Sequence, residues 1–293
     1  MPANYDYLSR IRSLLALHSR HLSDNALEGA FRSTRHSRSM EFEDLREYVW
    51  GDEVRDIDWR SSARTGTVLV RRFVAERRHS VLVVADCGAK MDASSSFGED
   101  KATLACDAVG TIAYMALLHG DEVGLVAGGS GEIEFTGFRS SRGHAETLLA
   151  RYDRISRLDG VPLSRMVDHV ADGMGRRAIV FVVTDMDGLE TLDDRAIARL
   201  STRNDVMVVD IDDAYLAGDL LWDAEAGDYE ARAILADPSV AEAERAERRA
   251  RLEAADARCR RHGAHLAVIG RAAEIPDRMV ELLQEARERS VNF

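Results

Sequence analysis

The sequence predicts an α/β fold, in which a mostly parallel sheet carries helices on both faces and follows a small β element. Several short apolar runs are typical of buried strands, and segments with helical spacing separate them. The first and a later run, VLVVAD and AIVFVVTD, end in Asp86 and Asp185. Alternating strands and helices favour a parallel sheet covered on both faces. Ligands of such sheets lie beyond the carboxyl ends of the strands, so both aspartates are candidate site residues.

Ahead of the α/β unit the chain changes character twice. Apolar spacing in YDYLSRIRSLLALHSR predicts a helix, and a polar, Arg/Ser-rich stretch follows it. Aromatic and charged residues then mix, and VLVRRF predicts a strand. We therefore predict an N-terminal helix and polar loop at 1–39, a β element at 40–79 and an α/β domain at 80–293.

The α/β domain can be assigned element by element. EVGLVAGG and EIEFTGF flank a Gly/Ser turn and predict a hairpin. An acidic insertion at 213–238 precedes an Arg/Glu/Ala-rich helix, whose charges indicate a solvated face. The predicted strands lie at 81–86, 122–129, 132–138, 178–185, 205–212 and 265–270. The predicted helices lie at 100–119, 143–157, 163–174, 189–202, 239–262 and 275–289.

Composition limits the function. Hydrophobic residues make up 45% of the 293 residues, which is enough for a large core. The 51 acidic and 39 basic side chains give a net charge of −12, which disfavours nucleic acid as the main partner. Three scattered cysteines indicate a reducing compartment without a disulfide framework. No signal peptide or long apolar run is visible, so we expect a cytoplasmic protein with no integral membrane span.

Asp86 is followed by Lys90 four residues later, in DCGAK. Mg²⁺ takes an octahedral set of oxygens. Asp86 and Asp185 can each supply one, whereas Gly88 and Lys90 supply none. Three interpretations stay open: a metal site on the two aspartates, a site in which the Lys90 ammonium neutralises both, or aspartates that cap helices and bind loop amides. Of the 39 basic residues only Lys90 and Lys101 are lysines, and both follow Asp86 closely.

Residues 41–66, EFEDLREYVWGDEVRDIDWRSSARTG, mix arginines, acids and aromatics. Aromatic residues and arginine dominate binding hot spots, while the excess of acids disfavours a phosphate backbone. The stretch is either a small β element held by ion pairs and buried aromatics, or a recognition surface. The alternation of Ile57, Asp58 and Trp59 predicts a buried Trp59. The candidate interaction residues are Arg46, Tyr48, Asp52, Arg55, Asp58, Trp59 and Arg64.

Together these stretches resemble the bacterial domain-of-unknown-function 58 family. The resemblance lies in EFEDLREY, GDEVRDIDWRSSARTG, VRRFVAER and the strand to Asp86, and covers about residues 35–185. It continues through KATLACDAVGTIAYMAL, with Lys101 at the family's lysine position, and DEVGLVAGG. The resemblance implies a von Willebrand factor A-like, Rossmann-like fold.

The resemblance also implies a metal site from which this sequence departs. That site uses D-x-S-x-S after the first strand, a threonine from a later loop and an aspartate after a central strand. Asp86 and Asp185 match the two acids, but Gly88 and Lys90 stand at the serine positions. The loop at 158–164, LDGVPLS, offers no threonine. We therefore expect a degenerate, metal-free site within reach of Lys90; any metal would be held by Asp86 and Asp185.

Relatives in this family often lie beside genes for MoxR-type AAA+ ATPases. The resemblance therefore implies a non-enzymatic protein-interaction adaptor that acts with such an ATPase and with other proteins. The alternative is a divalent-metal-dependent hydrolase or phosphotransfer enzyme that uses Asp86 and Asp185. The sequence holds no GxxxxGK[ST] loop and no HExxH spacing, and the missing oxygen ligands favour the adaptor. We expect no catalytic residue and no cofactor, with Mg²⁺ as the one alternative.

Overall fold

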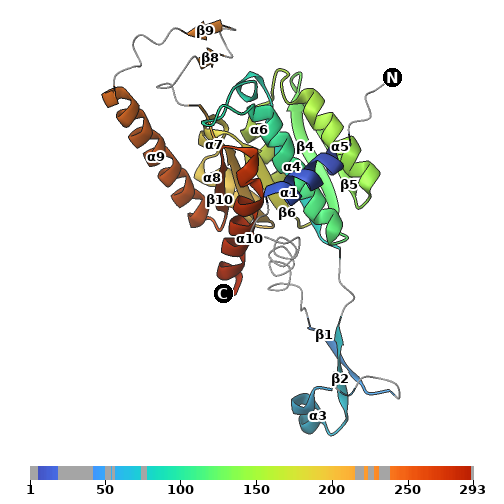
Figure 1. Ribbon diagram of the computed structural model, residues 1–293. Coiled ribbons are helices and arrows are strands. Elements are labelled where there is room, and N and C mark those ends of the chain that lie inside the picture. The colour runs from blue at the N-terminus through green and yellow to red at the C-terminus, as the bar shows by residue number, and fades with distance from the viewer. Residues whose placement is uncertain are drawn as a thin grey trace.

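A six-stranded sheet forms the centre of the molecule (Figure 1). The computed structural model describes residues 6–18, 42–49, 54, 57–73, 78–214, 221–223, 228–230 and 238–291. The strands of the sheet are β3 (Ser80–Ala85), β4 (Glu122–Gly129), β5 (Glu132–Arg139), β6 (Ile179–Thr184), β7 (Asp205–Ile211) and β10 (His265–Ile269). Every residue of β3 and β6 is buried, which agrees with their uninterrupted apolar runs.

The strand order is that of a doubly wound fold. The strands lie in the order β10-β7-β6-β3-β4-β5. If the six strands are numbered along the chain and read from the β5 edge, this is the order 3-2-1-4-5-6. β3 is parallel to both β4 and β6, whereas β5 returns antiparallel to β4 at the edge. The predicted α/β fold is confirmed. The order reverses between β3 and β6, and this switch point is where such sheets bind ligands.

Helices cover both faces of the sheet. On the first face, which we call the α5 face, lie α1 (Tyr7–His18), α4 (Lys101–Leu118), α5 (Arg142–Ile155) and α10 (Ile275–Val291). On the second, the α6 face, lie α6 (Leu163–Gly173), α7 (Met186–Glu190), α8 (Asp194–Ser201) and α9 (Pro238–Arg261). Alternate strand residues enter the two cores: Val83 packs toward the α5 face and Val84 toward the α6 face.

Short polar side chains cap the first turn of several helices. Asp100 caps α4 by accepting from the backbone N–H of Thr103 at 2.7 Å. Asp193 caps α8 in the same way through Ala196, at 2.8 Å. This second cap corrects the predicted single helix at 189–202, which is divided into α7 and α8. In the described part of the chain, α4 alone is long and apolar enough to span a membrane, and 78% of it is buried inside the domain. It is a core helix that packs on the sheet beside α5.

Residues 42–73 form a separate small unit. β1 (Phe42–Glu47) pairs antiparallel with β2 (Leu69–Phe73), as expected of a β element. A helix not predicted from the sequence, α3 (Trp59–Thr65), lies between them. None of the unit's described residues belongs to either core, and Figure 1 shows it apart from the six-stranded sheet. Within the predicted insertion, β8 (Leu221–Asp223) pairs with β9 (Asp228–Glu230). The predicted domain boundaries stay predictions.

Candidate functional site: a lysine-filled cluster at the switch point

Asp86 and Asp185 lie side by side at the carboxyl edge of the sheet. Each follows directly on a central parallel strand, β3 or β6, and the Asp86 N–H donates to the Val183 carbonyl at 2.8 Å. Both residues are only 1% exposed. Two carboxylates in so buried a position need compensating charge or hydrogen bonds, because burying an unpaired charge is costly.

Lys90 supplies one of the compensating charges. A 3₁₀ turn at Ala89–Met91 carries it back over the strand end. Its Nζ lies 2.5 Å from Asp86 Oδ2 and 3.0 Å from Asp185 Oδ1. The prediction that Lys90 lies within salt-bridge reach of these aspartates is confirmed. Thr184 adds a hydrogen bond, since its hydroxyl donates to Asp86 Oδ2 at 2.7 Å.

Lys101 supplies the second charge from the first turn of α4. It is 1% exposed, and its Nζ lies 3.0 Å from Asp185 Oδ2 and also contacts Asp213 Oδ1. Asp185 is thus held between two ammonium groups. Both lysines of the chain meet in this cluster, while arginine serves everywhere else. A compact ammonium on a flexible stem can enter such a space, whereas a planar guanidinium needs more room.

Burial and pairing move the pKa values of these groups in different directions. Burial raises the pKa of Asp86, and Lys90 only partly offsets it. Burial acts the same way on Asp185, but Lys101 and Lys90 outweigh it and lower the pKa of that carboxyl. For both lysines the neighbouring carboxylates outweigh burial, so their pKa values are raised and both stay charged. Asp185 is therefore the ionised centre of the cluster.

The two aspartates also bind backbone amides. Asp185 caps α7 by accepting from the Gly188 N–H at 2.9 Å, and Asp86 accepts from the Cys87 N–H at 2.9 Å. The capping interpretation and the lysine-filled interpretation therefore hold together. The packing is tight: a Cβ on Gly188 would lie 2.1 Å from Thr184 Oγ1, 2.4 Å from Asp86 Oδ2 and 2.7 Å from Lys90 Nζ.

These residues do not fit a divalent cation. The Lys90 ammonium stands between the two carboxylate oxygens that a cation would need, and Gly88 has no side-chain oxygen. The loop at 158–164 does reach the site, as the resemblance implies, because a Cβ on Gly160 would lie 2.2 Å from the Cys87 carbonyl oxygen. It contributes backbone only, and its Val161 side chain packs in the core of the α6 face.

Sequence reasoning missed several members of the cluster. Thr184 interrupts an aliphatic strand just before Asp185, and that position was an available signal. Asp213 belongs to the acidic run DIDD after a buried strand. Asp210 is fully buried, and its carboxylate has no hydrogen-bond partner among the described residues. Burial raises its pKa well above the usual range, which favours the neutral form of this carboxyl.

The second candidate region is the 42–73 unit, and here one prediction is wrong. Trp59 is 65% exposed rather than buried. Asp58 is the N-cap of α3 and accepts from the N–H groups of Arg60 and Ser61, at 3.1 and 2.9 Å. The helix begins at Trp59, so the strand alternation that would have turned its side chain inward ends at Ile57, which is buried.

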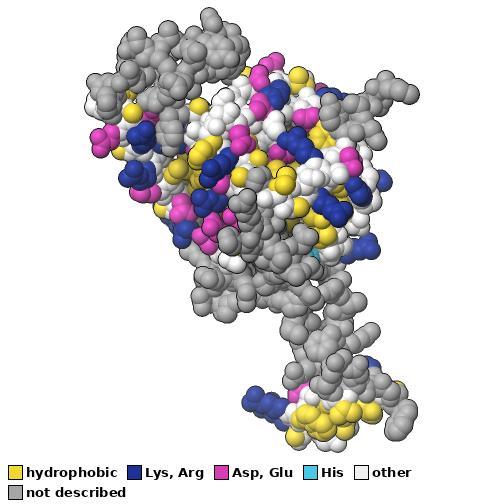
Figure 2. Space-filling model, viewed as in Figure 1, with side chains coloured by type: hydrophobic (Ala, Val, Ile, Leu, Met, Phe, Trp, Pro, Cys, Tyr) yellow, Lys and Arg dark blue, Asp and Glu magenta, His cyan; other side chains and the backbone are white. Residues whose placement is uncertain are grey.

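The other predicted interaction residues are distributed around the unit. Arg46 and Arg64 are exposed, and Tyr48 and Asp58 are half-buried. Asp52 and Arg55 lie outside the described residues. Large apolar side chains gather on the same unit, where Figure 2 shows a hydrophobic patch. Its exposed members are Val49, Val54, Trp59 and Val68. We call this set the Trp59 surface.

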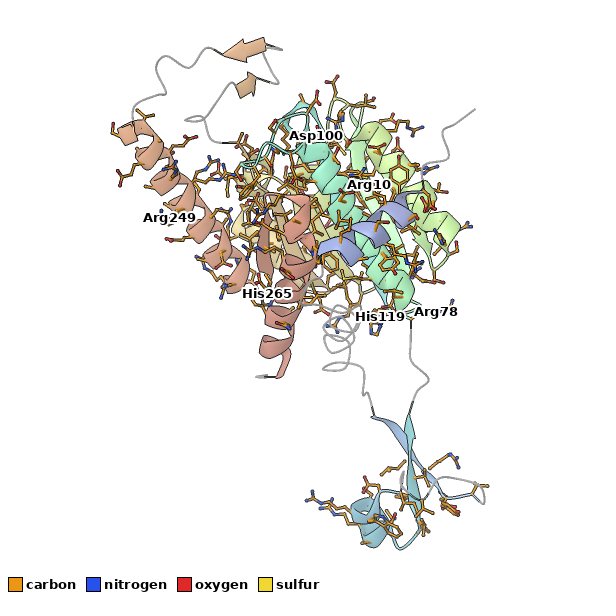
Figure 3. All side chains as sticks on the ribbon, in the orientation of Figure 1. Arg10, Arg78, Asp100, His119, Arg249 and His265 are labelled. Atoms are coloured by element: carbon orange, nitrogen blue, oxygen red, sulfur yellow. The ribbon has the colours of Figure 1, made fainter. Side chains whose placement is uncertain are left out.

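The Trp59 surface and the charged cluster belong to opposite ends of the domain. Figure 3 marks Asp100 at the carboxyl edge, beside the cluster, and Arg78 and His119 at the other edge. Arg78 lies two residues before the start of β3, so the 42–73 unit joins the domain at this amino edge. A doubly wound α/β domain with a lysine-neutralised switch point and an appended hairpin is the class that the structure defines.

The chain belongs to the family described as "Protein of unknown function DUF58", whose model matches residues 44–260. It is 25% identical over 171 residues to "Uncharacterized protein Rv1480" of Mycobacterium tuberculosis and to "Uncharacterized protein Mb1516" of Mycobacterium bovis. Each match covers 56% of this chain and 52% of the relative. The chain therefore spans about half the length of the curated relatives it matches.

The chain is also similar to several solved structures. A von Willebrand factor type A protein from Catenulispora acidiphila matches with a TM-score of 0.36 and 14% identity, over 75% of this chain and 44% of that one. An aerotolerance-related membrane protein from Bacteroides fragilis matches with a TM-score of 0.40 and 13% identity, over 71% of this chain and 99% of that one.

Proposed function

We propose that the chain is a non-enzymatic protein-interaction adaptor that acts in the cytoplasm with an AAA+ ATPase of the MoxR type. The observation that carries the proposal is the Trp59 surface. The described residues of this small unit belong to neither core, yet Trp59 is 65% exposed, Val54 63% and Val49 61%. Contiguous exposed apolar side chains mark interaction sites, and tryptophan is among the commonest hot-spot residues.

The arginines around this surface support a protein partner. Arg64 lies in the last turn of α3, and Arg46 lies on β1, the strand paired with β2. Arginine can give bidentate bonds to carboxylates at the rim of an interface whose centre is aromatic. We therefore place the ATPase contact on the unit at the amino edge of the domain, with Trp59 at its centre.

The charged cluster supports the non-enzymatic part of the proposal. Asp86 accepts from Lys90, Thr184 and an amide, and Asp185 accepts from Lys90, Lys101 and another amide. Neither carboxylate is free to hold a metal or to attack a substrate. No specific observation favours the alternative of a metal-dependent hydrolase or phosphotransfer enzyme.

The test is co-purification of the ATPase with surface variants whose fold is checked by circular dichroism. Trp59→Ala and Arg64→Glu should lose the ATPase, with affinity falling by about tenfold or more for the tryptophan. Phe97→Ala is the matched control, because Phe97 is an aromatic residue 57% exposed away from the unit. Retention of the ATPase by every folded variant of the unit would overturn this placement and direct the search to the carboxyl edge.

A further inference from the structure

The edge strand β5 offers an open backbone edge that the proposed adaptor role does not use. β5 pairs with β4 on one side and with no other described strand on the other. Its central residues, Phe135 to Phe138, carry no charge, and Phe135 is 50% exposed. An unpaired strand edge is a template for another strand, and natural proteins usually protect such edges with charge or cover.

The pairing of β5 with β4 fixes which side chains share a face. Thr136 and Arg139 oppose Leu125 and Val123, which pack in the core of the α5 face. Between them Gly137 and Phe138 share a single opposite residue, so this is a β-bulge. The residues of β5 on the α5 face are therefore Glu132, Glu134, Thr136 and Arg139. Those on the α6 face are Ile133, Phe135 and Phe138.

We propose that β5 pairs antiparallel with β5 of a second copy of this chain, across a two-fold axis at Phe135. With the bulge residue Gly137 set aside, Glu132 then stands opposite Arg139 of the second copy, and Ile133 stands opposite Phe138. Phe135 meets its own copy, and Glu134 meets Thr136. Every pair joins residues of one face, as cross-strand neighbours must. The symmetry makes each contact twice.

Charge complementarity selects the second copy rather than an unrelated strand. β5 is acidic at its start and basic at its end, so an antiparallel copy places the acidic start of each strand beside the basic end of the other, and the unlike charges meet twice. Arg151 of α5 adds to this match. Its guanidinium donates to Thr136 Oγ1 at 3.3 Å, and Thr136 faces Glu134 of the second copy in the proposed register. The same charges would repel a copy paired in parallel register.

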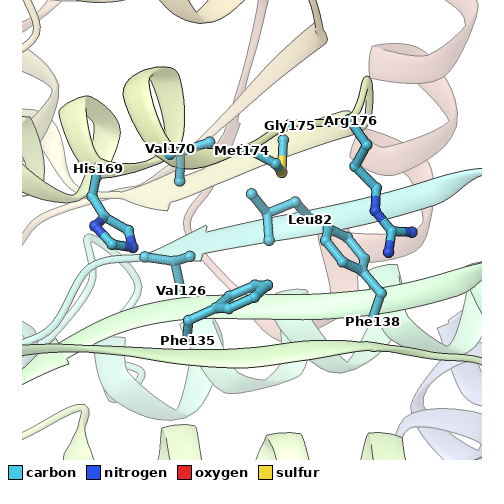
Figure 4. Close-up of a pocket in the computed structure, with 10 residues that line it drawn as sticks. Leu82, Val126, Phe135, Phe138, His169, Val170, Met174, Gly175 and Arg176 are labelled. Atoms are coloured by element: carbon cyan, nitrogen blue, oxygen red, sulfur yellow. The ribbon is translucent and has the colours of Figure 1, made fainter.

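The α6 face beside β5 supplies apolar surface to cover. A groove of about 440 Å³ runs between β5 and the end of α6, lined among others by Phe135, Phe138 and Met174 (Figure 4). Arg176 lies over the Phe138 ring, 4.6 Å from its centroid, at one end of the groove. Pairing brings Ile133 of the second copy to Phe138 and covers the exposed Phe135, so the two sheets continue as one.

A charge-swap series tests the proposal in the full chain. Sedimentation over a range of concentrations should show a dimer for the wild type. Glu132→Arg and Arg139→Glu should each weaken dimerisation by about tenfold, because each reverses two symmetric contacts. The double variant restores opposite charges and should restore the dimer. A wild type that stays monomeric at every concentration, or a double variant no better than the singles, would overturn the proposal and leave the edge open to another protein.

A disulfide cross-link tests the register without relying on charge. The native cysteines, Cys87, Cys106 and Cys259, are all buried. Phe135→Cys places a thiol opposite its own copy, at a backbone separation that a disulfide can bridge. Mild oxidation should give covalent dimer with Phe135→Cys and none with the control Phe97→Cys, whose exposure is similar. Equal cross-linking of the two variants would count against the two-fold at Phe135.

Discussion

The carboxyl-edge cluster and the 42–73 unit are both rich in charge, yet they use it in opposite ways. In the cluster, Asp86, Asp185 and Lys101 are each 1% exposed, and every one has a charged partner within the domain. In the unit, Arg46, Arg64 and Trp59 are exposed. Charged side chains therefore lie buried in ion pairs in one region and on the surface, where a partner can reach them, in the other.

The comparison also shows that an exposed aromatic residue says more about binding than a buried pair of acidic residues does. A buried ion pair is weak support for stability, because desolvation offsets its Coulomb energy, but removing one member leaves a costly unpaired charge. An exposed tryptophan contributes little to folding, whereas contiguous exposed apolar side chains mark interaction sites. The comparison would fail if a variant of the cluster left the stability unchanged, or if a variant of the exposed Trp59 unfolded the protein.

The largest expected effect comes from Lys101→Met. The substitution keeps an unbranched apolar stem but leaves Asp185 and Asp213 without their shared ammonium. Removing one partner of a buried pair costs about 3–5 kcal/mol of unfolding free energy. Urea unfolding measures it, with Arg64→Met on the exposed face of α3 as the matched control, expected within about 0.5 kcal/mol. A loss below about 1 kcal/mol for Lys101→Met would show that the ammonium is dispensable.

Lys90→Ala should have a smaller effect, because Lys90 is 31% exposed and shares the neutralisation with Thr184 and two amides. We expect a loss of about 1–3 kcal/mol, or a new affinity for Mg²⁺ that restores the stability. Melting with and without excess Mg²⁺ separates the two results. Calorimetric titration of the wild type with Mg²⁺ or Mn²⁺ should show no heat of specific binding. Binding with a micromolar dissociation constant that depends on Asp86 would contradict the lysine-filled site.

Lys90→Arg distinguishes charge from shape at the same position. The variant keeps the positive charge but must fit a planar fork where a Cβ on Gly188 would already lie 2.7 Å from Nζ. We expect a lower melting temperature than the wild type. A wild-type melting curve for this variant would show that the space around the ammonium is not limiting.

The sheet and half of the cluster follow from local sequence. Uninterrupted apolar runs identify β3 and β6, and parallel pairing brings the residues that end them to one edge. Lys90 follows Asp86 by four residues, close enough for one tight turn to join them. Lys101 and Asp213 are different, because they are 112 residues apart and meet only through the tertiary fold. No local pattern predicts that contact.

The two wrong predictions about where a helix begins share one physical cause, which is capping. The carboxylates of Asp58 and Asp193 each accept a hydrogen bond from a backbone N–H of the following turn, and a helix begins there. Periodicity alone predicts a strand at Asp58 and one longer helix around Asp193. At Asp58 this turns Trp59 outward, and at Asp193 it separates α7 from α8. Aspartate before a helical pattern is a signal in the sequence, but it competes with the strand alternation around it.

The pH dependence of two asparagine variants sharpens the account of the cluster. The pKa of Asp185 is lowered from 3.8, so its ionised form stabilises the fold above that pH. The contribution is lost as the pH falls below 3.8 through the lowered pKa. The unfolding free energy of the wild type should therefore exceed that of Asp185→Asn near neutral pH, and the gap should narrow in acid. Denaturant titrations at a series of pH values measure the gap.

Asp86→Asn is the matched control for this series, because burial raises the pKa of Asp86 and reverses the sign. Its protonated form is favoured in the fold, so the wild type should lose stability relative to Asp86→Asn as the pH rises above 3.8. Gaps that change in the same direction for both variants would contradict the assignment of Asp185 as the ionised centre.

The smallest expected effect on stability is that of Trp59→Ala, and it tests the other side of the comparison. Truncating a buried aromatic residue costs about 3–5 kcal/mol, which is what Phe181→Ala in the fully buried β6 should show. Trp59 is 65% exposed at the start of a helix, and alanine suits a helix at least as well. Trp59→Ala should therefore change the unfolding free energy by no more than about 0.5 kcal/mol. Urea unfolding monitored by circular dichroism suits both variants, since it does not depend on tryptophan fluorescence. A loss of several kcal/mol would mean that Trp59 belongs to a folding core after all, and its exposure could then no longer support a binding surface.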